Sequence, residues 1–291
     1  MLPLPDQEML LAPLQPLLAN GTVSAIRLST RPDAIDADGA AFLLDHGVKT
    51  VELGVQSLDD AVLGAAGRGH TAKDVRDAVG ILHETGLCVG IQLMPGLPGS
   101  SREQDLASLD GALGLSPAFI RIYPALVLEG TGLAGIYEAG EYEPLVLEEA
   151  VSLSACMLHR CMKAKVPVVR VGLQATDSLC QPGKIVAGPF HPAFRQLVES
   201  ELCLCLMRKI TGGLDCGTKV IVRCAPSRVS DVAGQRRANL DKIAATGIIV
   251  ERIVTDNSLS PLEMIIITPL GERRGNLLND LEFNNKGNLY D

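Results

Sequence analysis

The sequence predicts an α/β protein whose larger part is an incomplete parallel (β/α) barrel, followed by a smaller α/β C-terminal unit. In the first half of the chain, short apolar runs rich in β-formers alternate with amphipathic helical runs. Two of these helical runs close on a glycine, Gly47 and Gly86, which is typical of helix C-termini. Strand–helix–strand repetition implies right-handed crossovers, and these give a parallel sheet.

Four strands are predicted first, parallel and adjacent in chain order. Helical runs at 36–47, 71–86 and 102–115 separate them, because apolar residues recur there at helical spacing. Four strands should leave an open arc, with its exposed edge at the strand that contains Ile26. An upstream chain segment or self-association is expected to cover this edge. The strands are expected at 23–28, 50–55, 87–93 and 119–126.

The rest of the chain continues the alternation and then changes character. A helix is expected at 147–164 and a strand at 166–174, before a segment rich in glycine and proline, 181–193. We therefore expect a partial barrel with its extension over residues 1–182 and a small α/β domain over residues 183–291. Within the second domain, the pattern predicts a βαββ unit and then a loose tail from residue 271, GERRGNLLNDLEFNNKGNLYD.

Composition excludes several classes of protein. Aromatic residues make up 3% of the chain and Trp is absent, which argues against a stacking platform for single-stranded nucleic acid. The formal net charge of −8 argues against a simple basic nucleic-acid-binding surface. The N-terminal run has no basic region and is broken by prolines, so we expect neither signal peptide nor membrane span, and a cytoplasmic protein.

The eight cysteines are expected to be reduced thiols that pack as small hydrophobic side chains. None of them forms a CxxC or CxxxCxxC motif, so spacing predicts no metal site.

Polar residues follow the predicted strands where each strand ends. Because the C-terminal ends of parallel strands meet at one rim, these side chains should surround a single cleft. They offer hydrogen-bond donors and acceptors but few titratable groups, which suits gripping a polar ligand such as a nucleoside. The residues concerned are Ser29, Gln56, Ser57, Gln92, Met94 with the following PGLPG turn, Tyr123 and Pro124.

Arg68 and His70 lie just beyond the second predicted strand. The planar guanidinium of Arg68 suits a ligand carboxylate, although it could instead cap a helix or bridge to Asp59 or Asp60. His70 directly precedes TAKDV, so we expect it to belong to the start of a helix rather than to bind metal.

Four segments resemble the radical S-adenosylmethionine enzymes. They are RLSTRPDAID, VELGVQSLDDAVLGAAGRGHT, VGIQLMPGLPGSS and FIRIYPALVLEGT, in that order along the chain. More narrowly, they resemble bacterial proteins related to the catalytic subunit of Elongator and, more distantly, oxygen-independent coproporphyrinogen oxidase. The resemblance runs from about residue 5 to about residue 200 and implies S-adenosylmethionine and a 4Fe-4S cluster as cofactors. By analogy, the substrate would be an RNA nucleoside.

The resemblance also implies roles for residues. Gln56 and Arg68 stand where relatives contact S-adenosylmethionine, with Arg68 on the methionine carboxylate and Gln56 on the ribose or amino group. Ser29 takes the place of a ligand-contacting acid, and Gln92 that of an aspartate. Pro124 falls where backbone touches the adenine end.

The CxxxCxxC loop that holds the cluster in these enzymes does not occur in the 291 residues. Two hypotheses follow: a radical enzyme whose cluster loop is supplied from upstream or by another chain, or a truncated remnant that is catalytically inert. A third, an ordinary (β/α) barrel enzyme without a cluster, would leave the four motifs unexplained.

Overall fold

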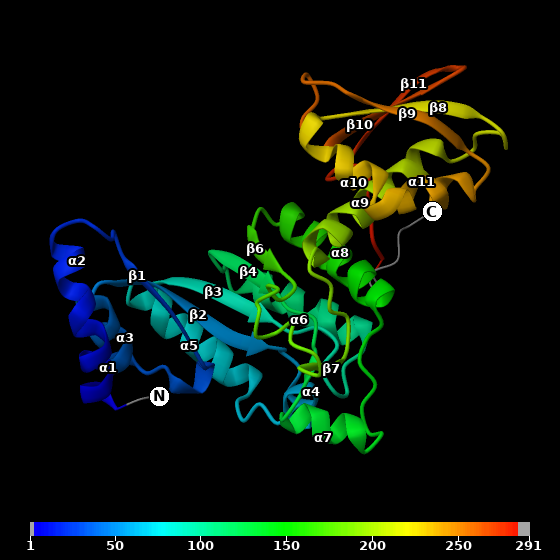
Figure 1. Ribbon diagram of the computed structural model, residues 1–291. Helices are drawn as coiled ribbons and strands as arrows, with labels where there is room; N and C mark the ends of the chain where they lie inside the picture. Colours follow the sequence, from blue (N-terminus) through cyan, green and yellow to red (C-terminus); the bar gives the residue numbers. More distant parts are fainter. Residues whose placement is uncertain (1–2, 285–291) are drawn as a thin grey trace.

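Five parallel strands form one curved sheet in this computed structural model, which describes residues 3–284 (Figure 1). The sheet order is β1-β2-β3-β4-β6, so the four predicted strands are parallel and adjacent in chain order, as expected. The strands are β1 Ile26–Thr30, β2 Val48–Gln56, β3 Cys88–Leu93, β4 Phe119–Ile122 and β6 Val168–Val171.

Two details of the predicted arc are corrected. The arc has five strands rather than four, because β6, expected as a strand but not assigned to the sheet, pairs with β4. The strand predicted at 119–126 ends at Ile122, where Pro124 removes a backbone donor and ends the regular ladder. β1 lies at one end of the sheet, as expected, and β6 lies at the other. Whether another chain segment or a second copy covers β1 stays a prediction.

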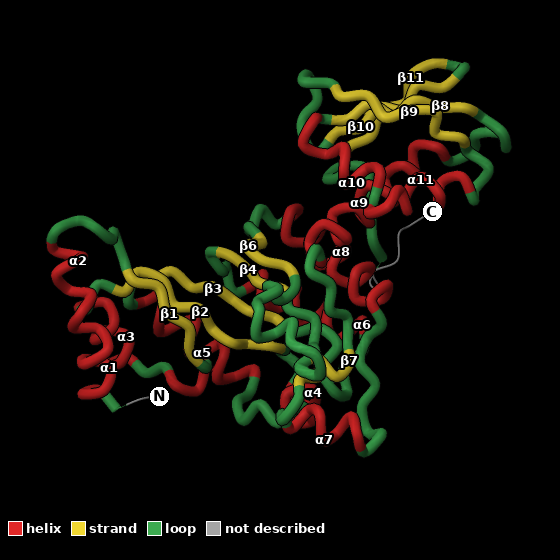
Figure 2. The backbone as a smooth tube through the Cα atoms, viewed as in Figure 1, coloured by secondary structure: helices red, strands yellow, loops and turns green. Residues whose placement is uncertain are grey.

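Helices cover one face of this sheet (Figure 2). Two of them begin with a capping box, Thr71 with Asp74 and Ser101 with Gln104, in which side chains satisfy the first backbone N–H groups. Gly47 follows the helix that ends at Asp45, and Gly86 follows the helix that ends at Glu84. Both glycines hold the C′ position and have positive φ, as predicted. The four helices are α3 Ala37–Asp45, α5 Ala72–Glu84, α6 Arg102–Gly114 and α8 Leu147–Lys163.

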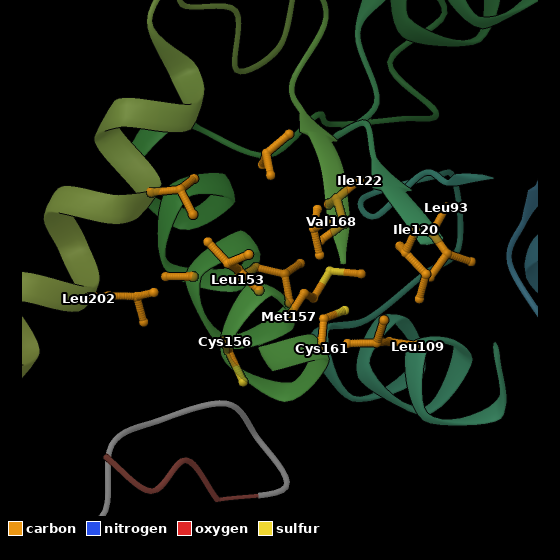
Figure 3. Packing of buried hydrophobic residues seen from close by; sticks show 14 of the residues in the cluster. Leu93, Leu109, Ile120, Ile122, Leu153, Cys156, Met157, Cys161, Val168 and Leu202 are labelled. Atoms are coloured by element: carbon orange, nitrogen blue, oxygen red, sulfur yellow. The ribbon is translucent and has the colours of Figure 1, made fainter. Parts of the chain in front are cut away.

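The core lies between the sheet and these helices. Figure 3 shows side chains of β3, β4 and β6 meeting those of α6 and α8, with Met157 near the centre of the labelled group. Met157, Leu109 and Ile120 have no solvent exposure. Cys156 and Cys161 are buried in the same cluster, as the cysteine prediction expects, whereas Cys88, Cys180 and Cys216 are exposed.

A second sheet lies beyond α9 Phe194–Thr211, with strand order β11-β10-β8-β9 (Figure 1). β8 Lys219–Cys224 and β9 Ile249–Thr255 are parallel and joined through α10 Val229–Ala233 and α11 Ala238–Ala244. β10 Glu263–Thr268 is antiparallel to β8, so the predicted βαββ unit is present.

The loose tail predicted from residue 271 is wrong for its first six residues. They form β11 Gly271–Asn276, antiparallel to β10. Polar side chains hid this strand, because an edge strand with one solvated face has few apolar residues. Residues 285–291 of that prediction lie outside the described part of the chain.

Two further features concern the arrangement of the whole chain. The Nε2 atom of His159 in α8 lies 3.0 Å from the backbone oxygen of Leu277, which joins the barrel helices to the end of β11. Between residues 3 and 284, no helix is long and apolar enough to cross a membrane. The remaining elements are α1 Leu4–Leu11, α2 Gln15–Ala19, α4 Asp60–Ala65, β5 Val127–Leu128, α7 Gly132–Glu138 and β7 Ile185–Ala187. The division of the chain at residue 182 stays a prediction.

Candidate functional site

Gln56 and Gln92 meet at the C-terminal edge of the five-stranded sheet. The Nε2 group of Gln92 donates to Oε1 of Gln56 at 3.1 Å. Gln56 has a φ of +66°, a conformation that side-chain-bearing residues rarely adopt and that proteins retain mainly at functional sites. Its amide folds back over Gly54, where a Cβ would lie 2.8 Å from Gln56 Nε2. The glycine in GVQ is therefore needed for the position of this amide.

Arg68 lies beside the same two strands, and its guanidinium is poorly satisfied. Its Nη2 group donates to the sulfur of Met94 at 3.1 Å, and a thioether is a weak acceptor. Its Nε atom is buried and has no hydrogen-bond partner among the described residues. Burial, with a smaller contribution from the positive charge of Arg31, lowers the pKa of Arg68. A carboxylate ligand would supply the acceptors and the negative charge that this guanidinium lacks.

Backbone contacts bring Arg68 and Gln56 together. The backbone N–H of Met94 donates to the oxygen of Gln56 at 2.9 Å, so the partner of Arg68 is attached to the end of β2. The alternative partners Asp59 and Asp60 are occupied elsewhere: Asp59 caps α4, and Asp60 accepts from the backbone of Ala72.

The other predicted site residues are placed less closely together. Ser29 is exposed on β1 and is in register with Glu52 of β2. Pro124 is buried and shares a small pocket with Gly172, Phe190 and Phe194, which neither Gln56 nor Gln92 lines. The structure thus brings Gln56, Gln92 and Arg68 together and places Ser29 on β1 and Pro124 in the loop after β4.

His70 is buried against the end of β2. Its Nε2 atom lies 3.1 Å from the backbone oxygen of Val55, so the ring supports the end of β2. It directly precedes Thr71, the N-cap of α5, as the sequence predicts.

A charged network that the sequence pattern did not predict lies on the concave face of the sheet, the face opposite the helices. Glu52 is 2% exposed and forms ion pairs with Arg27 of β1 and with Arg121 of β4, the latter at 3.3 Å. Arg121 also donates to the hydroxyl of Tyr123 at 3.1 Å. One charged residue stands inside each of two apolar strand segments, Glu52 in VELG and Arg121 in FIRIY. This pattern is the sequence signal that could have predicted the network.

Phe119 lies at the N-terminal end of β4, with its ring beside this charged network. Its ring lies across Gly90, where a Cβ would come within 2.1 Å of the ring, and the guanidinium of Arg27 lies 4.5 Å above the ring centroid. The face is therefore polar towards the C-terminal strand ends and carries an aromatic ring at the level of Gly90 and Glu52.

The PGLPG turn is held from below by Asp105 of α6. The carboxylate of Asp105 accepts from the backbone N–H of Gly96 at 2.9 Å, and the hydroxyl of Tyr142 donates to the oxygen of Gly96 at 2.6 Å. Burial raises the pKa of Asp105 to about 7. The turn is thus a buried, side-chain-supported loop, and its glycines at 96 and 99 have positive φ.

The residues of this site suit one of the two cofactors that the family resemblance implies, and not the other. The unsatisfied guanidinium of Arg68 beside two amides fits the amino acid end of S-adenosylmethionine. An iron–sulfur cluster does not fit: the 291 residues hold no CxxxCxxC loop, and no group of three His, Cys, Asp or Glu side chains in the described part of the chain is placed to hold a metal ion.

Comparisons with known proteins identify the family of this chain. The model of the Radical SAM superfamily matches residues 3–110, and that of the Radical_SAM C-terminal domain matches residues 117–203. The tRNA uridine(34) acetyltransferase of Methanocaldococcus jannaschii is 38% identical over 132 residues, 44% of this chain and 24% of the relative. Human Elongator complex protein 3 is 32% identical over 137 residues, 46% of this chain and 25% of the relative.

Among solved structures, the Elp3 protein of Methanocaldococcus infernus with an N-terminal deletion superimposes with a TM-score of 0.54 and 27% identity. The match covers 68% of this chain and 49% of that one. The chain spans about a quarter of the length of the curated relatives it matches. On the two domain matches and the motifs at the strand ends, this chain belongs to the radical S-adenosylmethionine superfamily.

Proposed function

We propose that the chain binds S-adenosylmethionine at the C-terminal edge of β1 to β4 and is part of a protein that modifies an RNA nucleoside. The observation that carries the binding proposal is the guanidinium of Arg68, partly buried beside the Gln56–Gln92 pair with a sulfur as its acceptor. Enzymes of this superfamily cleave bound S-adenosylmethionine reductively.

Each residue of the proposed site has a task within this chain. Arg68 would pair with the methionine carboxylate, because its buried Nε and its Nη2 lack a charged acceptor. Gln92 fixes the amide of Gln56 by hydrogen bonding, which leaves the Gln56 Nε2 group free to donate to the ligand ribose or amino group. Ser29 and Pro124 would flank the ligand from β1 and from the loop after β4.

The substrate part of the proposal depends on the relatives. Those reported above are named as tRNA uridine(34) acetyltransferases and Elongator complex protein 3, which supports a tRNA nucleoside and the predicted cytoplasmic location. Deleting the gene and measuring the modified nucleosides of total tRNA by mass spectrometry tests it. Loss of a modified uridine supports the proposal, and an unchanged nucleoside profile overturns it.

Calorimetric titration tests the binding site. We expect Arg68→Gln to weaken binding of S-adenosylmethionine roughly tenfold to a hundredfold, the usual value of a charged hydrogen bond. Binding of decarboxylated S-adenosylmethionine should not change, because it lacks the group that Arg68 contacts. Arg76→Gln, which removes an exposed arginine of α5, is the matched control. An equal loss for both ligands would refute the assignment of Arg68 to the carboxylate.

The second candidate function is S-adenosylmethionine binding without catalysis, and one observation favours it: the 291 residues hold no CxxxCxxC loop. Anaerobic reconstitution of the purified chain with iron and sulfide, followed by an assay for 5′-deoxyadenosine, tests whether these 291 residues are inert by themselves. Neither a cluster nor product is expected, and four iron atoms per chain together with product would exclude this second function.

A further inference from the structure

A pocket of about 530 Å³ lies between the barrel helices and the second sheet. None of the site residues Gln56, Arg68 and Gln92 lines it. It is bounded by the end of α8, the loop before β6, α9, and the segments that flank β10 and β11. Its volume is in the range of small-molecule sites. Most of its wall is apolar, from Leu158, Met162, Val166, Pro167, Val168, Leu202, Pro261, Leu262, Leu277 and Leu278.

Three cations line this pocket against fewer acids. Arg195 pairs with Glu199 at 2.8 Å, and Arg228 pairs with Glu199 at 2.6 Å and with Asp231 at 3.0 Å. The two negative charges of Glu199 and Asp231 therefore balance the two positive charges of the arginines. Lys165, the third cation, is exposed at the pocket and has no ion-pair partner among the described residues. The balance leaves one positive charge beside an apolar wall.

The backbone of Lys165 allows its side chain to be tested. Lys165 occupies the C′ position after α8 with a φ of +58°, in the left-handed region that favours glycine. The corresponding positions after α3, α5 and α7 are Gly47, Gly86 and Gly140, and the one after α6 is Ser116. Glycine can therefore replace this lysine and relieve the backbone strain, which separates the role of the ammonium group from that of the backbone.

We infer that this pocket binds a small amphipathic carboxylate, with the carboxylate on Lys165 and an aliphatic or aromatic body against the leucines. One unpaired positive charge suits a monoanion better than a phosphate dianion, since the two arginines are already neutralised. The ligand would contact both α8 and the second sheet and so strengthen the junction between them.

Titration with four probes of one chain length tests the charge selectivity: octanoate, octyl phosphate, octanol and octylamine. We expect octanoate to bind at least tenfold more tightly than octanol, octyl phosphate or octylamine. Equal binding of octanoate and octanol, or a preference for octyl phosphate or octylamine, would overturn the inference.

Lys165→Gly separates function from folding. Glycine relieves the left-handed backbone, so we expect the melting temperature to rise by about 1–3 °C while octanoate binding weakens at least fivefold and octanol binding stays unchanged. Ser116→Gly is the matched control, because Ser116 holds the same C′ position after α6 with a φ of +53° and does not line the pocket. Unchanged octanoate binding by the Lys165→Gly variant refutes the site.

Discussion

Asp105→Asn should change how the stability of this protein depends on pH. Asp105 is 5% exposed, and burial raises its pKa from 3.8 to about 7. The folded state therefore holds the proton of this carboxyl more tightly than the unfolded state does. Raising the pH above the unfolded pKa then favours unfolding, and this loss is complete once the pH passes the folded pKa.

The magnitude follows from the size of the shift. One pKa unit corresponds to about 1.4 kcal/mol, so the rise from 3.8 to about 7 costs the wild type about 4 kcal/mol of unfolding free energy between pH 4 and pH 8. Asparagine keeps the shape and the acceptor for the Gly96 N–H but has no charge to bury. The variant should therefore gain on the wild type by about 2 kcal/mol from pH 5 to pH 7.

Urea denaturation at half-unit steps from pH 5 to pH 8 measures this gain. The difference between variant and wild type is the informative quantity, because other groups titrate in both proteins. His159 is one of them: burial lowers its pKa, so its contribution to stability falls as the pH drops below about 6.5, opposite in direction to Asp105. A difference that is flat from pH 5 to pH 8, or that shrinks with rising pH, would refute the reasoning.

Three core changes can be measured in the same denaturation assay at constant pH. Gly90→Ala should cost about 1–3 kcal/mol, because the new methyl group would overlap the Phe119 ring, and Phe119→Ala in the same chain should restore part of it; additive losses would contradict the contact. Glu52→Ala should cost about 1–3 kcal/mol, since two arginines lose their shared carboxylate, whereas no loss would show that the network is not stabilising. Met157→Ala should cost about 2–5 kcal/mol for the cavity left in the core of Figure 3, and a loss below 1 kcal/mol would mean that the helices close over it.

The sequence by itself determined the order and direction of the first four strands and the helices between them. This was possible because hydrophobic periodicity and glycine C-caps are local signals that tertiary contacts did not override. The motif GVQ also placed Gln56 at a strand end, and its glycine proved necessary for the side chain.

Only the tertiary structure decided which residues meet. The sulfur of Met94 opposite Arg68, the carboxylate of Glu52 between two arginines, and the pocket beside Lys165 join residues 25 to more than 100 positions apart. Likewise, β11 escaped the sequence pattern because an edge strand is defined by its neighbour β10 rather than by its own apolar residues. Such features depend on strand pairing and on burial. Both are set by residues that are distant in the sequence, so a local sequence pattern does not predict them.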